Sequence, residues 1–357
     1  MKHSSGYILI VTMLMVASAT ALVNAIFYQS GVTVSLVYMA IGREKAKLLA
    51  FSGLEVTRAQ LSYVSPKPEK QPANQAGNAQ KQQPPDPVKE LLTRILPSLN
   101  RWQTFELREQ IDGIDAELKI CIMSEEGKIN LNKIYDFNKH VFMGEKAEQE
   151  NWKTILKQLL KKVESEMKMS NLFESLEKFL KKAEEPFDDI TQLLLIPEWQ
   201  KFKDMLYYQP AVPEHKGTRP LYLTDIFTLY SPTARLQPWL FSDSMLALIG
   251  FARASGQESG DRAKNVVEWL KSFKKNVNWK TDWATSLKLV YQKELQSLPK
   301  GIDSVLSTTV APKMFSVLSK ATVEGISQHI FAYIEVIEQV ENGQTIYDTT
   351  IKKWYLL

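Results

Sequence analysis

The feature that constrains this chain most is an uncharged segment near its N-terminus. After Lys2 and His3, no charged residue occurs before Arg43. Within this segment, residues 7–28 are apolar except for Thr, Ser and Asn. At 1.5 Å per residue they make a helix of about 33 Å, which is enough to cross a hydrocarbon core of about 30 Å. The segment therefore predicts a membrane-spanning helix.

A helical composition continues beyond this span. Residues 42–63 read GREKAKLLAFSGLEVTRAQLSY, and most of their charged residues lie off one small or apolar helical face. That face comprises Ala46, Leu49, Ala50, Gly53, Leu54 and Leu61. A single helix over residues 7–63 would be about 85 Å long. We expect one half to lie in lipid and the other half to project from it.

Two questions about this segment stay open at the level of sequence. A cleaved secretory signal is an alternative, because Ala17-Ser18-Ala19 resembles a small-x-small cleavage site. The apolar core of such a signal has only about 7–15 residues, however, and this run is longer. Basic residues flank the span on both sides, so they do not fix its orientation.

The next segment predicts a linker. Residues 65–88 hold six of the sixteen prolines, five Gln and a single large apolar residue. Such a composition buries too little surface to fold, so we expect a flexible tether. A Pro-rich recognition motif is the alternative interpretation.

Two separate stretches, 89–136 and 306–357, predict one β domain. In the first, residues 91–102 suit a short helix or an approach strand. Strands are expected around residues 111–115, with a turn at Asp112-Gly113, and over 116–122. In the second, three β-rich runs cover 313–323, 328–340 and 345–356, and Asn342-Gly343 joins the last two as a hairpin turn.

The stretch between them, 137–305, predicts an inserted all-helical domain. Apolar residues follow helical spacing over 148–182, with a second helix starting at Asn171, and Asp189 with Gln192 caps a third. Further helices are expected over 242–254, 261–275 and 281–298. The fold class is therefore α+β: a long N-terminal helix, an antiparallel sheet and a large helical insertion.

The residue inventory excludes several kinds of chemistry. One cysteine among 357 residues rules out an intramolecular disulfide framework and a Cys-rich zinc site, and four dispersed histidines form no paired metal motif. The 44 basic and 40 acidic residues balance too closely to indicate nucleic-acid binding. No nucleophile elbow, P-loop or dinucleotide fingerprint occurs, so we expect a protein that is not an enzyme. Cys121 lies in an apolar strand and is expected to be an inert core thiol.

Two further groups of residues are candidates for binding. Four carboxylates lie within six residues, at Glu184, Glu185, Asp188 and Asp189. Clustered oxygen ligands suit Ca²⁺, although the spacing matches no EF-hand and charge at a helix start explains the same residues. Among the aromatic residues, Trp199, Trp239 and Trp354 are expected to be core or interface anchors, and an exposed Tyr207-Tyr208 pair would be a partner contact.

The short leader Met1–Gly6, followed by an apolar helix with a small-residue extension, resembles the precursors of type IV pilin-like proteins. The resemblance implies that prepilin peptidase cuts the Gly6–Tyr7 bond and that the new amine at Tyr7 is methylated. Most pilins and major pseudopilins have Glu as the fifth mature residue, where this chain has Val11. The absence of this Glu is the pattern of the K-type minor pseudopilin of type II secretion.

Three internal stretches are similar to the same subfamily. The first is SEEGKINLN at 124–132, which contains Glu125, Glu126, Gly127, Lys128, Asn130 and Asn132. The others are LLLIPEW at 193–199 and LTDIFTLY at 223–230, the latter corresponding to a strand of the family. The chain departs from the family pattern at Ser231–Leu236, where the family has an I-N-x-N-T-A segment, and in the added linker.

The resemblance implies a structural subunit at the tip of the type II secretion pseudopilus. Such a subunit supports filament initiation and the export of folded proteins across the outer membrane. Its partners are other minor pseudopilins, the inner-membrane assembly platform and prepilin peptidase, with no nucleic acid. It is a single-pass inner-membrane protein with its C-terminal domain in the periplasm. No cofactor is expected, although the resemblance allows calcium. Small residues at Ala40, Gly42, Ala46, Ala50 and Gly53 would let neighbouring pseudopilin helices approach closely.

Two alternatives remain from the sequence. The first is a minor pilin of a type IV pilus or a DNA-uptake system, which would use the same leader and helix. The second is a membrane-anchored periplasmic binding or sensor domain, which would retain residues 1–6.

Overall fold

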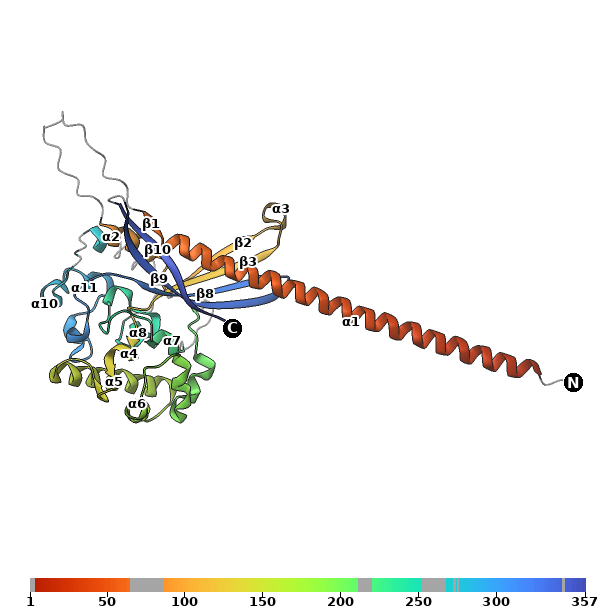
Figure 1. Cartoon of the computed structure of the whole chain (residues 1–357), viewed down its shortest axis with the longest axis horizontal. Helices are drawn as coiled ribbons and strands as arrows, with labels where there is room; N and C mark the ends of the chain where they lie inside the picture. The colour runs from red at the N-terminus through yellow and green to blue at the C-terminus, as the bar shows by residue number, and fades with distance from the viewer. Residues whose placement is uncertain are drawn as a thin grey trace, which may run out of the picture.

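The computed structural model describes residues 4–64, 86–210, 220–251, 268–271, 274, 276–341 and 344–357, with the side chains of the first helix described from Thr12 on. That helix, α1 (Ser4–Leu61), is 58 residues long. It extends far beyond the rest of the molecule (Figure 1). The expected linker at 65–88 lies outside the described residues up to position 85, and its last residues belong to helix α2 (Pro87–Ile95). Asp86 caps this helix by accepting a hydrogen bond from the Val88 amide at 3.0 Å.

Helix α1 divides into two halves with different surroundings. From Thr12 to Ile41 every side chain is exposed. From Gly42 on, one face is buried against the sheet at a spacing of three to four residues, which is the repeat of a helix. This face comprises Gly42, Ala46, Ala50, Gly53, Leu54, Thr57 and Leu61. Four of the five small residues that the sequence assigned to contacts with neighbouring helices therefore pack on the chain's own sheet, and only Ala40 is exposed.

The sheet has six strands in the order β1-β10-β9-β8-β3-β2, and every neighbouring pair is antiparallel. The strands are β1 (Tyr63–Val64), β2 (Trp102–Leu107), β3 (Ala116–Ser124), β8 (Met314–Val323), β9 (Ile326–Glu341) and β10 (Gln344–Leu356). The three C-terminal runs read from the sequence are therefore strands. Their hairpin turn at Asn342-Gly343 lies outside the described residues.

The hairpin between β2 and β3 confirms the expected strands on either side of a turn, and its connection contains a short helix. The expected turn at Asp112-Gly113 lies between the two paired strands, and Glu109–Asp112 form a short helix, α3, within the connection. Gly113 ends this helix with φ of 73°, a left-handed conformation that glycine adopts without strain. The Asp112 carboxylate accepts a hydrogen bond from the Arg108 amide at 2.9 Å, which closes the turn locally.

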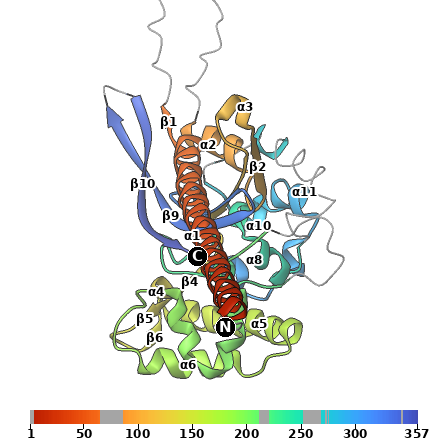
Figure 2. The ribbon, with the colours of Figure 1, turned by 90° about the vertical axis from the view of Figure 1, so that its right-hand side faces the viewer.

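The insertion packs on the face of the sheet opposite to α1. Leu118 and Ser319 lie against Gly53 of α1, and side chains alternate along a strand. The neighbouring residues Cys121, Leu318 and Phe331 therefore face the other way. There they form a buried cluster with Met123, Tyr208 and Tyr333, against which Trp102, Tyr207, Tyr222, Tyr230 and Tyr355 pack. Figure 2 shows α5 and α6 gathered at the side of the molecule away from β1 and α2.

The elements between β3 and β8, which include the insertion, are short apart from two helices. They are β4 (Ile129–Asn130), α4 (Leu131–Ile134), β5 (Tyr135–Asp136), β6 (Val141–Phe142), α5 (Lys146–Met167), α6 (Leu172–Lys182), η1 (Ile190–Leu195), η2 (Pro197–Met205), α7 (Leu223–Ile226), β7 (Phe227–Thr228), η3 (Pro238–Leu240), α8 (Asp243–Leu248), α10 (Trp279–Asp282), α11 (Leu287–Tyr291), η4 (Leu295–Ser297) and η5 (Ile302–Val305). Elements labelled η are 3₁₀ helices.

Several expectations about the insertion are wrong in detail. Strands β6 and β7 lie within it, so it is not all-helical. The expected helix 281–298 is broken into the separate elements α10, α11 and η4, and the helix at Asp189 is a 3₁₀ helix with the expected capping box. The stretch 223–230 starts with helix α7 and only then forms the short strand β7. Helix α8 ends at Leu248, and most of the expected helix at 261–275 lies outside the described residues. The α+β class is nevertheless confirmed.

Candidate functional site: the exposed helix and the buried acidic motif

The exposed half of α1 presents an unusually large apolar surface. Its large side chains between Met13 and Ile41 are 44–77% exposed. Exposure of a continuous apolar surface of this size to water is unfavourable. Such a surface is therefore typical of contact with lipid or with other proteins. Within the described part of the chain, α1 is the one helix that is long and apolar enough to cross a membrane. It could therefore anchor the chain in a membrane.

Three hydroxyl groups in this half are compatible with an apolar environment. The hydroxyl groups of Ser18, Thr20 and Thr33 donate hydrogen bonds to the carbonyl oxygens of Met15, Val16 and Gln29, at 3.0, 2.8 and 2.9 Å. Each hydroxyl is thus satisfied within the helix itself, which reduces the cost of removing it from water.

The residues of the expected processing site lie at the start of the same helix. Gly6, Tyr7 and Val11 belong to α1, and their side chains lie outside the described residues. Cleavage at the Gly6–Tyr7 bond, methylation of Tyr7 and the role of Val11 therefore stay predictions.

The SEEGKINLN motif lies at the junction between the sheet and the insertion. It follows β3, forms a tight turn in which the Lys128 amide donates to the Glu125 carbonyl at 3.2 Å, and continues into β4 and α4. Glu125, Glu126, Lys128 and Asn130 are all buried. Burial of charged groups is expensive unless they are paired, so the partners of these groups determine what the motif does.

Glu125 and Lys128 form a buried ion pair. The Lys128 ammonium also donates to the Ser316 hydroxyl of β8 at 3.0 Å. The Glu125 carboxylate accepts hydrogen bonds from the hydroxyls of Ser316 and of Thr228, which lies on β7. One ion pair thus connects the sheet, the motif and the insertion.

Glu126 secures the first residues of β8. Its Oε1 accepts hydrogen bonds from the amides of Lys313 and Met314 at 2.6 and 2.9 Å, and its Oε2 accepts from the Ser124 hydroxyl at 2.9 Å. Burial raises the pKa of this carboxyl group to about 7, although the hydrogen bonds it accepts act in the opposite direction. The group is therefore partly protonated near neutral pH, and in that form it can donate a hydrogen bond to the Ser124 oxygen.

The other residues of the motif hold it against the insertion, through a close backbone contact at Gly127 and through the side-chain amides of two asparagines. A Cβ atom at Gly127 would collide with the carbonyl group of Leu240, so only glycine fits there. The Asn130 amide donates to the Ser231 carbonyl at 2.6 Å. Asn132 makes a reciprocal pair with the backbone of Phe187, donating to its carbonyl at 2.8 Å and accepting from its amide at 2.9 Å.

A buried carboxyl group near the motif was not anticipated from the sequence. Asp225, on α7, accepts a hydrogen bond from the Ser244 amide at 2.6 Å, and its Oδ1 has no hydrogen-bond partner among the described residues. Burial raises its pKa to about 6. Burial together with the charge of Asp225 also raises the pKa of the Cys121 thiol well above its usual value, as expected for an inert core thiol. The sequence does not indicate this burial, because a single acidic residue in a short apolar run could equally be exposed.

The carboxylates of the acidic cluster at 184–189 are not brought together as a group in the described part of the chain. Glu184, Glu185 and Asp188 are exposed. Asp189 uses its two oxygens to accept hydrogen bonds from Thr191, and from Lys353 and Tyr355 at 3.1 and 2.5 Å. No three His, Cys, Asp or Glu side chains are grouped as metal ligands within the described ranges. In this structure Asp189 instead links the insertion to β10.

The aromatic candidates are mostly structural. Trp199 and Trp239 are buried. Trp354 is 48% exposed and makes an edge-on contact with Phe51 of α1, at 5.0 Å between ring centroids. The tyrosine pair is not exposed, because Tyr208 is buried and donates its hydroxyl to the Asn100 carbonyl at 3.1 Å, and Tyr207 is half-buried against Phe331.

Comparisons with known proteins find a likeness among solved structures. No protein-family model matches this chain, and neither does any curated protein. Among solved structures, the chain is similar to a chain of the GspK-GspI-GspJ complex from the type 2 secretion system of enterotoxigenic Escherichia coli. The identity is 12% and the TM-score 0.36, and the match covers 75% of this chain and 92% of that chain.

Proposed function

We propose that this chain is a non-enzymatic minor pseudopilin of the K type, which stays at the tip of the type II secretion pseudopilus and helps to start the filament. The observation that carries the proposal is the division of α1. One half is apolar and exposed on all sides, and the other half is integrated in the sheet of a folded domain. This arrangement suits a subunit that is stored in a membrane and later assembles through its helix.

The apolar half of α1 would have two successive environments. In the inner membrane, lipid would cover the exposed side chains from Met13 to Ile41. During assembly, the helices of other minor pseudopilins would replace the lipid. Van der Waals packing between complementary helix surfaces would drive this step, because lipid tails are as apolar as the helices and no hydrophobic effect favours the exchange. The folded domain would lie in the periplasm, held at a defined angle because residues from Gly42 to Leu61 are fixed on the sheet.

The residue at position 11 supports a location of the subunit at the tip of the filament. In the pilin family, a glutamate at the fifth mature position neutralises the N-terminal amine of a neighbouring subunit in a dry bundle of helices. This chain has Val11, so it would offer no such carboxylate. A tip subunit has no neighbour above it that needs the pairing, and the large insertion would obstruct further stacking.

The mature N-terminus tests the processing part of this proposal. Mass spectrometry of the protein from its native membrane should give a chain that starts at methylated Tyr7. A chain that starts at Met1 would favour a membrane-anchored binding or sensor domain, and a chain that starts after Ala19 would identify a cleaved signal.

The system in which the protein works needs a genetic test. Deletion of the gene should reduce pseudopilus initiation and protein secretion, and a variant with Gly6→Leu should fail to restore them because the peptidase site is lost. Normal secretion in the deletion strain, combined with a loss of pili or of DNA uptake, would assign the chain to a type IV pilus or DNA-uptake system instead.

A further inference from the structure

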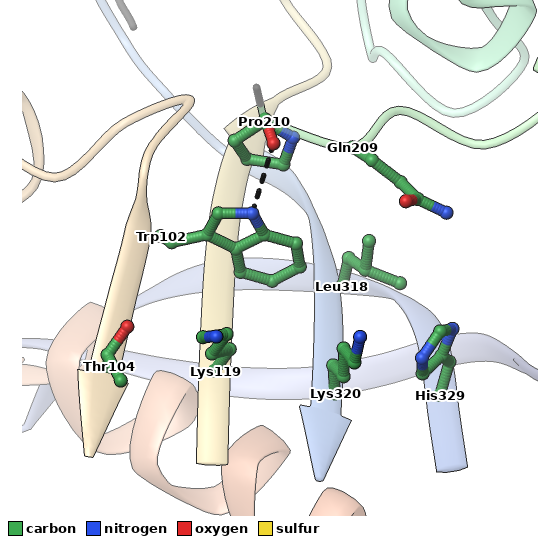
Figure 3. A pocket seen from close by; sticks show the side chains of 8 residues that line it. All are labelled: Trp102, Thr104, Lys119, Gln209, Pro210, Leu318, Lys320 and His329. Carbon is green, nitrogen blue, oxygen red and sulfur yellow. Dashed lines mark hydrogen bonds between the residues drawn. The ribbon is translucent and has the colours of Figure 1, made fainter. Parts of the chain in front are cut away.

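An open cleft lies on the face of the sheet that carries the insertion, near the edge strand β2. Its walls come from β2, β3, β8 and β9 and from the segment Gln209–Pro210, and it has a volume of about 320 Å³ (Figure 3). This is the lower end of the size range of small-ligand sites in proteins. The strand register explains how the cleft forms, because Thr104, Lys119, Lys320 and His329 pair with one another in a row across four neighbouring strands.

The charges in this row are incompletely matched. Lys119 forms an ion pair with Glu117 at 2.7 Å. Lys320 and His329 are direct cross-strand neighbours, and no acidic side chain pairs with either of them in the described part of the chain. Burial, and then the charge of Lys320, lowers the pKa of His329. Two basic groups are thus held together, and no acidic side chain of the described residues pairs with them.

The neighbouring rows limit what the cleft can accept. Toward the α3 hairpin, the next row on this face places Glu106 opposite Glu117, which would repel an anion there. Toward the insertion, the next row contains Trp102 and Leu318, which are apolar. The Trp102 indole donates a hydrogen bond to the Pro210 carbonyl at 3.1 Å, and this bond fixes the ring as a wall of the cleft (Figure 3). The cleft is therefore cationic on one side and apolar on the other.

We propose that this cleft binds a carboxylate group with an apolar neighbour, as presented by an acidic residue next to an aromatic or aliphatic residue in a peptide. The carboxylate would lie between Lys320 and His329, and the apolar side chain would contact Trp102, Leu318 and Pro210. A carboxylate suits the site better than a phosphate group, because one unpaired ammonium and one imidazole match a single negative charge. A phosphate monoester carries about 1.5–2 charges at neutral pH. The peptide site does not depend on the secretion system to which the chain belongs.

Isothermal titration calorimetry with the purified full-length chain in a non-ionic detergent tests the site. The probes are acetyl-Leu-Glu-Phe-amide and its neutral counterpart acetyl-Leu-Gln-Phe-amide, with empty micelles as the blank. The acidic peptide should bind about tenfold more tightly than the neutral one, because a charge-assisted hydrogen bond is lost in the neutral peptide. Equal affinities would overturn the proposal, and so would inorganic phosphate binding as tightly as the acidic peptide.

Matched lysine variants separate this site from general attraction by a basic protein. Lys320→Gln should weaken binding of the acidic peptide by about tenfold, and Lys320→Arg should retain most of it. Lys133→Gln, which removes the same charge from an exposed position on α4, should leave the affinity unchanged. Near-ultraviolet circular dichroism confirms that each variant is folded. Equal losses for Lys320→Gln and Lys133→Gln would refute a localised site.

Discussion

Glu126 is a buried carboxyl group that binds the start of β8, and its pKa of about 7 links the stability of the fold to pH. Because its folded-state pKa lies above the ordinary value of 4.5, the folded protein holds more protons than the unfolded chain between these values. Stability must then fall as the pH rises through this range. Asp225, with a pKa raised from 3.8 to about 6, contributes in the same direction.

We therefore expect the full-length chain in detergent to melt at a higher temperature at pH 5 than at pH 7.5. Together the two groups would contribute about 4 kcal/mol over this range. In Glu126→Gln the amide mimics the protonated carboxyl group, so the pH dependence should become shallower. Thermal melts followed by circular dichroism at several pH values measure this pH dependence. An unchanged slope in Glu126→Gln would show that Glu126 does not titrate in this range.

Lys128 and Glu125 allow a second prediction about single residues. Lys128→Met would leave the Glu125 carboxylate buried without its cation, so we expect a loss of about 3–5 kcal/mol in the free energy of unfolding. The double variant Glu125→Gln with Lys128→Met removes both charges and should recover a large part of this loss. Thermal melts of the two variants and the wild type provide the comparison. If the double variant melts below the single variant, the ion pair is not the source of the effect.

The role of these residues could be predicted from the sequence only in part. The pattern of the motif identified residues 124–132 as a unit, but their partners are Thr228, Leu240 and Ser316, which lie about 100–190 residues further along the chain. The cationic cleft was missed for the same reason. Lys119, Lys320 and His329 become neighbours through strand register, and nothing in their local sequence indicates it.

At the level of elements, local signals predicted the structure wherever they were strong and repeated. The three C-terminal strands follow from β-rich runs, and α5 and α6 follow from apolar residues at helical spacing. The broken helix at 281–298 did not follow from its sequence. There the indole groups of Trp279 and Trp283 donate to the carbonyl oxygens of Ser307 and Lys293, so tertiary contacts fix a compact series of turns. Such contacts override a weak local preference for a continuous helix.

Two glycines in α1 offer a matched test of how this helix is used. At Gly53 a Cβ atom would collide with the Ser319 hydroxyl of β8, whereas at Gly31 nothing lies within 4 Å. Gly53→Val should therefore push the helix away from the sheet and destabilise the fold by about 1–3 kcal/mol, as overpacking does. Gly31→Val should leave the melting temperature of the folded domain unchanged. Similar melting temperatures for the two variants would contradict the close approach of α1 to β8.

For the whole molecule, the distribution of charge defines two parts. The segment from Ser4 to Gly42 carries no charge, and residues 43–357 hold all of the Lys, Arg, Asp and Glu side chains except Lys2. The boundary falls where α1 reaches the sheet, since Gly42 is the first buried residue on its packed face and Arg43 is the first charged one. Chemistry and packing therefore change at the same point of one continuous helix. Such a chain is suited to an interface between lipid and water.

This division predicts how the chain responds to charge placed in either half of α1. Leu14 and Leu48 are almost equally exposed, at 67% and 65%. Leu14 lies in the apolar half of α1, whereas Leu48 lies in the half that packs on the sheet. A variant with Leu14→Arg and Leu22→Arg places two charges in the membrane span, each at a cost of about 2.5–3.5 kcal/mol near the centre of an inserted helix. A control variant with Leu48→Arg and Ser52→Arg adds the same charge beyond the span, at positions exposed on the packed half.

The measurement is the fraction of protein that stays in the membrane pellet after an alkaline carbonate wash. The wild type and the control variant should remain in the pellet, because their apolar half is intact. The variant with Leu14→Arg and Leu22→Arg should be lost from it to a large extent, because about 5–7 kcal/mol of insertion energy is removed. If all three proteins wash off equally, the exposed half of α1 is covered by protein rather than by lipid. If all three stay, contacts outside residues 12–41 hold the chain at the membrane.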